Sequence, residues 1–142
     1  YGEITFEAIY AIINRLRQDR SWAAEPQGRS KTFVDLGSGA GRVLFSAAVC
    51  YPFQKCVGIE ILESLHKLAL AARNEYDRIS DLWGGDFTDS VELVRGSMFD
   101  LNLFDWTQAD VVVACSTCFS ADMFEGLSVM GSRMKKGSYF IS

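Results

Sequence analysis

Residues 32–43 read TFVDLGSGAGRV, a short apolar run that passes into three closely spaced glycines and then into an apolar helical segment. The apolar run predicts a buried strand with Asp35 near its end. Gly37, Gly39 and Gly41 permit a tight turn and a close approach of the backbone to a ligand, and the start of the next helix offers free N–H groups. The segment therefore predicts a strand, a ligand-binding turn and a helix in succession.

The same alternation of apolar strands and amphipathic helices continues along the chain. We expect strands at 32–36, 55–60, 91–95, 110–115 and 138–141, helices at 5–17, 41–51, 63–79 and 121–134, and loops at 21–31 and 82–90. Thr5 is expected to cap the leading amphipathic helix. Such alternation is typical of a parallel sheet covered on both faces. We therefore predict an α/β fold, a Rossmann-like doubly wound parallel sheet with five strands, in which ligands bind at the carboxyl ends of the strands.

Composition limits the class of protein. The 142 residues carry 14 Lys and Arg against 18 Asp and Glu, a formal net charge of −4, and 49% are hydrophobic. One globular domain over 1–142 is expected, with a leading segment at 1–20 and a core at 32–142. No apolar run suits a membrane span, and an acidic chain does not favour binding to a polyanion. Because the chain begins with Tyr1 rather than Met and shows no signal peptide, we expect an intracellular fragment of a longer protein.

The spacing of the glycines separates two classes of cofactor. The dinucleotide fingerprint is G-x-G-x-x-G, whereas this turn is G-x-G-x-G and Arg42 occupies the place of the third glycine, which disfavours a nicotinamide-dependent dehydrogenase. Glu60 ends the second predicted strand, 25 positions after Asp35. An acid at such a position accepts hydrogen bonds from a ribose diol, so the pattern favours a nucleoside cofactor.

The cysteines and the single histidine could suggest a metal or redox site. Cys115 and Cys118 form a C-x-x-C pair, but zinc needs further ligands. We interpret Cys50 and Cys56 as small core residues and His66 as a solvated helix residue. No metal is therefore predicted.

The string D-L-G-S-G-A-G resembles the first motif of class I S-adenosylmethionine-dependent methyltransferases. This resemblance implies S-adenosyl-L-methionine as cofactor and assigns Glu60 to its ribose. It also assigns the residues of the glycine turn to cofactor binding, namely Asp35, Gly37, Ser38, Gly39 and Gly41.

Three stretches taken together, YGEITF at the start, FVDLGSGAGRV and VGIEI, resemble the disruptor of telomeric silencing (Dot-one type) family of histone lysine methyltransferases, which lack a SET domain. The resemblance covers most of the chain. It implies that the leading segment folds over the cofactor, with Glu3 near its methionyl end and Thr5 shaping the loop.

The family carries an acid and an aromatic residue beside the adenine, after the third strand. Two stretches could correspond, 85–87 (GDF) and 96–98 (GSM). The second follows the strand-like VELVR at a suitable interval, so we assign Ser97 and Met98 to the adenine side and treat the first as a loop.

After the fourth strand the family has an Asn-Asn-Phe-type motif that lines the lysine channel. Here the chain reads VVVACSTCFS, which places Ser116 at the family's asparagine and Phe119 in the channel. Tyr1 is a further channel residue by resemblance. These three form the predicted catalytic set.

The resemblance implies direct transfer of a methyl group to a lysine of a nucleosomal core histone, in the nucleus. Nucleosome or histone is then the partner, with nucleic-acid contact supplied by flanking segments and no membrane contact. Two alternatives stay open: a methyltransferase acting on another protein or a small molecule, for which a cytoplasmic location would serve, and a catalytically silent cofactor-binding module. The final antiparallel hairpin of class I methyltransferases is expected to lie outside this sequence.

Overall fold

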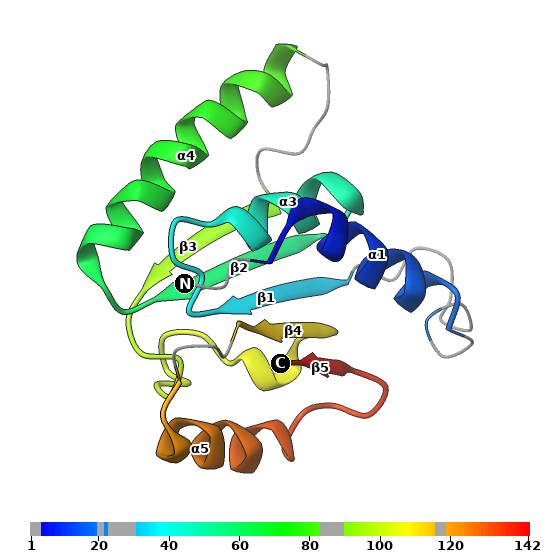
Figure 1. The fold of residues 1–142 in the computed structure, drawn as a ribbon, viewed down its shortest axis with the longest axis vertical. Helices are drawn as coiled ribbons and strands as arrows, with labels where there is room; N and C mark the ends of the chain where they lie inside the picture. The colour runs from blue at the N-terminus through cyan, green and yellow to red at the C-terminus, as the bar shows by residue number, and fades with distance from the viewer. Residues whose placement is uncertain (1–3, 20–21, 23–30, 83–89, 116–118) are drawn as a thin grey trace.

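The computed structural model describes residues 4–19, 22, 31–82, 90–115 and 119–142 (Figure 1). Within these residues five strands form a single sheet in the order β3-β2-β1-β4-β5, and every neighbouring pair is parallel. The strands are β1 (Thr32–Leu36), β2 (Lys55–Glu60), β3 (Val91–Arg95), β4 (Val111–Ala114) and β5 (Tyr139–Ile141). The predicted doubly wound parallel sheet is confirmed.

The strand order locates the place where a ligand would bind. The chain moves outward from β1 through β2 to β3 and then returns to the other side of β1 to form β4. The loops after β1 and β4 therefore leave the sheet in opposite directions and open a crevice at the carboxyl ends of these two strands. The glycine turn follows β1 and so lies at this crevice.

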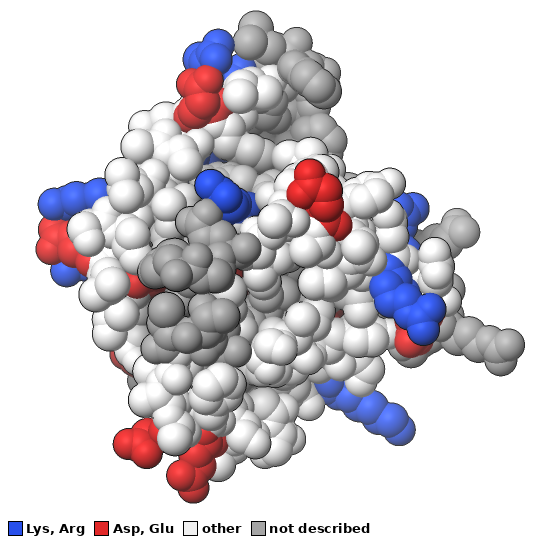
Figure 2. Space-filling view, in the orientation of Figure 1, with Lys and Arg blue, Asp and Glu red and all other residues white. Residues whose placement is uncertain are grey.

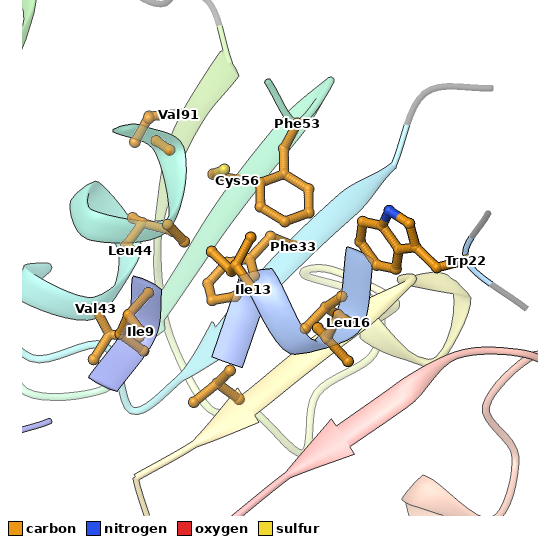
Figure 3. Packing of buried hydrophobic residues seen from close by; sticks show 14 residues of the cluster. Ile9, Ile13, Leu16, Trp22, Phe33, Val43, Leu44, Phe53, Cys56 and Val91 are labelled. Carbon is orange, nitrogen blue, oxygen red and sulfur yellow. The ribbon is translucent and has the colours of Figure 1, made fainter. Parts of the chain in front are cut away.

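Helices cover both faces of the sheet, as Figure 1 shows. On one face lie α1 (Phe6–Arg17), α3 (Arg42–Cys50) and α4 (Glu63–Leu82). Helix α4 contacts α3 through the rings of Tyr76 and Phe45. On the other face pack α5 (Ala121–Gly131) and a 3-10 turn, η2 (Trp106–Gln108). The helical spacing of Ile9, Ile13 and Leu16 turns all three side chains into the first core cluster, where Ile13 lies beside Phe33 (Figure 3).

The second core cluster lies under η2 and α5. Trp106 is fully buried there, and Leu127 of α5 packs against the same group of strand residues. The predicted core position of Cys56 is confirmed, because it is buried in the first cluster. Cys50 is only half-buried.

Most predicted element boundaries agree with the structure to within one residue, and Thr5 caps α1 by accepting a hydrogen bond from the Ala8 N–H at 3.3 Å. Two helix ends were predicted wrongly. Helix α4 continues to Leu82, and α5 ends at Gly131 rather than at 134. After Gly131 the backbone tightens into i to i−3 hydrogen bonds, because glycine is a poor helix former and the last carbonyls need new donors.

An ion pair with a buried carboxylate, at the amino edge of the sheet, was not predicted. The Asp110 carboxylate accepts the Thr32 N–H at 2.8 Å and pairs with the Lys135 ammonium at 2.7 Å. The Asp110 backbone also bonds to Thr32 and to Tyr139. Asp110 thus joins the starts of β1, β4 and β5 through its side chain and its backbone together, and this holds the sheet that carries the crevice.

Candidate functional site

The glycine turn is pinned to the end of the neighbouring strand. The N–H groups of Gly37 and Ser38 donate to the Ile59 carbonyl at 2.9 and 3.1 Å. Gly37 and Gly39 have φ of 74° and 55°, a left-handed conformation that favours glycine. A Cβ built at Gly39 would meet no atom within 4 Å. At Gly39 the turn therefore presents bare backbone to open space.

Gly41 has a different structural task. Its φ is 87°, and a Cβ there would lie 2.6 Å from the Phe45 ring. Gly41 thus lets α3 begin directly after the turn while Phe45 packs against it. This contact brings the positive end of α3 close to the site.

Glu60 connects the segments that follow β1, β2 and β3 at the carboxyl edge of the sheet. One carboxylate oxygen accepts the Gly39 N–H at 2.9 Å, and the other accepts the Leu62 N–H at 2.7 Å. The Glu60 backbone carbonyl accepts the Gly96 N–H at 3.0 Å. Each carboxylate oxygen retains a second lone pair for a ligand. The acid predicted at the end of the second strand is therefore fixed beside the glycine turn.

Asp35 lies deep in the same edge. It is 1% exposed, and this burial raises the pKa of its carboxyl to about 7, with a further contribution from the negative charge of Glu60. Uncompensated burial of a carboxylate is costly, so the site favours a proton or an external cation at Asp35.

Ser38 is turned away from the open side of the turn. A Cβ at Gly58 of β2 would lie 2.8 Å from the Ser38 Oγ, so glycine is needed there for the serine to fit. This oxygen is buried and has no hydrogen-bond partner among the described residues.

Met98 and Phe119 meet at Gly37, although they come from the loops after β3 and β4. A Cβ at Gly37 would lie 3.5 Å from the Phe119 ring and 3.9 Å from the Met98 methyl carbon. Met98 is buried, and Phe119 stacks edge-on against Phe124 of α5 at 6.1 Å between ring centroids. The structure thus brings these two predicted site residues together beside the turn.

The remaining predicted residues either lie outside the described part of the chain or make other contacts. Tyr1, Glu3 and Ser116 lie outside the described residues. Thr5 caps α1, and none of its described contacts reaches the glycine turn. The Ser97 hydroxyl accepts the Phe99 N–H at 3.2 Å and so stabilises its own turn.

Sequence reasoning missed two contacts that shape the site. It did not find the hydrogen bond from Gly39 to Glu60, nor the bond from the Trp106 indole N–H to the Met98 carbonyl at 2.7 Å. A buried tryptophan carries one N–H donor that needs an acceptor, so the sequence could indicate that Trp106 makes such a hydrogen bond. The sequence could not identify the acceptor.

The described residues contain no group of three His, Cys, Asp or Glu side chains placed to hold a metal ion. Each helix in the described part is too short or too polar to span a lipid bilayer. Figure 2 shows that, on the face drawn there, the basic side chains stand apart and do not form a continuous patch.

Solved structures share the fold. The chain resembles a precorrin-6y C5,15-methyltransferase from Geobacter metallireducens with a TM-score of 0.63 at 16% identity, over 94% of this chain and 60% of that one. It resembles the rRNA methyltransferase aviRa from Streptomyces viridochromogenes with a TM-score of 0.63 at 13% identity, over 99% and 74%. The architecture is the Rossmann-like fold of class I methyltransferases.

Two fungal proteins named histone-lysine N-methyltransferase, H3 lysine-79 specific, are similar in sequence. The chain is 26% identical over 152 residues to the protein of Gibberella zeae and 28% identical over 144 residues to that of Chaetomium globosum. Both alignments cover 100% of this chain but only 27% and 26% of the relatives. The chain thus spans about a quarter of their length.

The family assignment rests on the whole sequence. Residues 1–142 match the family described as "Histone methylation protein DOT1". This match agrees with the predicted resemblance. The chain therefore belongs to the DOT1 histone methylation family.

Proposed function

We propose that this chain is an S-adenosylmethionine-dependent methyltransferase that methylates a lysine of a nucleosomal histone. The observation that carries the proposal is the Glu60 carboxylate, which backbone N–H groups hold beside the open glycine turn at the switch point of the sheet. Family membership supports the reaction class. The names of the fungal relatives favour lysine 79 of histone H3 as the acceptor.

The site has the donor and acceptor groups that this cofactor requires. Glu60 offers carboxylate lone pairs to a ribose diol. Burial destabilises the ionised carboxyl of Asp35, which favours the cationic amino group of the cofactor nearby. The glycine backbone at Gly37 and Gly39 has no side chain that would hinder a close approach of the cofactor. Met98 offers an apolar surface for the adenine side. These features fit S-adenosylmethionine.

When bound, the cofactor supplies an activated methyl group on a good leaving group. The chain then needs to align the acceptor amine and exclude water, and it needs no strong base. Phe119 and Met98 flank Gly37 with apolar atoms, as this task requires. An apolar environment also lowers the pKa of the lysine amine and so favours the neutral nucleophile.

If the methyl acceptor is a nucleosomal histone, the partner of this chain is the nucleosome and its location is the nucleus. We infer that the domain acts in the nucleus and contacts histone rather than DNA, because a net charge of −4 opposes binding to a polyanion.

Calorimetric titration with S-adenosylmethionine tests the cofactor, with NAD as the control ligand. We expect micromolar binding to the first and none to the second. Glu60→Ala should abolish binding. Glu92→Ala is the matched control, since it removes an exposed acid that pairs with Lys55 on the neighbouring strand, and it should bind as the wild type does. A folded wild type that binds no S-adenosylmethionine refutes the proposal.

Transfer of a labelled methyl group tests the acceptor. Nucleosomes, free histone H3 and small amines are offered in parallel, and mass spectrometry locates the modified residue. Methylation of a histone lysine supports the proposal. Binding without any transfer would show a silent cofactor-binding module, and transfer to small molecules alone would show a different acceptor class.

A further inference from the structure

We propose that Trp106 is a positioning residue for the cofactor site, because its indole N–H fixes the Met98 carbonyl and so holds the loop after β3 against the glycine turn. The inference rests on the proposed function, in which Met98 forms the adenine side. Trp106 itself lies in the core and touches no ligand in this scheme.

The contact between the two residues is short and fully buried. The indole nitrogen lies 2.7 Å from the Met98 carbonyl oxygen, and Trp106 is 0% exposed. A buried indole N–H cannot donate to water instead, so loss of its acceptor leaves an unsatisfied hydrogen-bond donor. The ring is also held by the second core cluster and lies 6.0 Å from the Phe140 ring, measured between centroids. Trp106 is therefore a rigid anchor.

The loop has local hydrogen bonds that shape it but tie it only to β2. Ser97 accepts the Phe99 N–H through its hydroxyl and the Asp100 N–H through its carbonyl. Gly96 donates to the Glu60 carbonyl at the end of β2. Among the hydrogen bonds of the described residues, the one from the Trp106 indole ties this loop to the core beside β4.

This tie matters because of what Met98 touches. Its methyl group lies close to Gly37, which the Phe119 ring also approaches. Methionine is flexible and fills irregular space, so the position of its side chain depends on a fixed backbone. Release of the carbonyl would let Met98 withdraw from the turn while the core stays filled.

The experiment compares four variants of the full chain: Trp106→Phe, Met98→Ala, their combination, and Phe33→Leu as a matched core control on the opposite face of the sheet. Calorimetry gives the affinity for S-adenosylhomocysteine, and circular dichroism gives Tm. We expect Trp106→Phe to weaken binding about fivefold to tenfold. The combination should bind no more weakly than Met98→Ala alone, because Trp106 acts through Met98. Phe33→Leu should lower Tm and leave the affinity unchanged.

A second readout needs no ligand. In protein with ¹³C-labelled methionine methyl groups, Met98→Ala assigns the Met98 signal. Trp106→Phe should shift that signal, whereas Phe33→Leu should not. An unmoved Met98 signal, or affinity losses that multiply in the combined variant, overturns the inference. Absence of S-adenosylhomocysteine binding by the wild type would instead refute the proposed function, because the methyl signal reports on the tie independently.

Discussion

Replacing Asp35 by Asn removes a buried carboxyl whose pKa burial raises from an ordinary 3.8 to about 7. The negative charge of Glu60 adds to this increase. The folded protein binds the proton of Asp35 more tightly than the unfolded chain does. Its contribution to stability is therefore fully present below about pH 4 and is lost as the pH rises through 7.

The magnitude follows from the pKa difference. One pKa unit corresponds to about 1.4 kcal/mol, so the ionised Asp35 costs the fold about 4 kcal/mol above pH 7. Most of this cost appears between the two pKa values. Between pH 5 and pH 7 the free energy of unfolding of the wild type should fall by about 2 kcal/mol. Asp35→Asn has no proton to lose and should show no such fall.

Urea denaturation followed by circular dichroism at pH 5, 6 and 7 measures the difference. Exposed acids whose pKa values are lowered, such as Glu63 beside Lys67 and Arg95, act only below about 4.5 and do not disturb this range. Glu92→Gln, an exposed acid on β3, should keep the slope of the wild type. Parallel curves for the wild type and Asp35→Asn would refute the reasoning.

Three further outcomes are expected. Gly41→Ala should lower the free energy of unfolding by about 1–3 kcal/mol, because a Cβ at φ 87° is strained and would lie 2.6 Å from the Phe45 ring. Adding Phe45→Leu to this variant should recover only the part of the loss that comes from the clash with the ring. Lys135→Met should destabilise the fold by about 3 kcal/mol in urea denaturation, since it leaves the buried Asp110 carboxylate without its cation; a loss below 1 kcal/mol would contradict this. The thiol of Cys56, whose pKa burial raises to about 12, should resist alkylation at pH 8 until the protein unfolds, as mass spectrometry would show.

Local patterns account for the features that were predicted correctly. The strand that ends near Asp35, the glycines that adopt positive φ, and the Thr5 cap each depend on neighbours in the sequence. The alternation of strands and helices restricts the sheet to a parallel arrangement. Glu60 was found because the end of a strand faces the same edge as the turn after the preceding strand.

Where local patterns failed, the surroundings decided the result. Helical periodicity alone assigns Leu68 to the packed face of α4, yet Leu68 is 57% exposed. Figure 1 shows α4 leaning away from the sheet, so part of its apolar face has no neighbour in the described structure.

The sequence alone determined the fold class, the glycine turn and the acid at the end of β2, because backbone conformation and hydrophobic periodicity act over a few residues. Only the tertiary structure brought Met98 and Phe119 to Gly37, paired Lys135 with Asp110, and gave the Trp106 indole its acceptor. These contacts join segments far apart in the chain, and they depend on the order in which the strands assemble. The raised pKa of Asp35 has the same origin, since desolvation is a property of the assembled core.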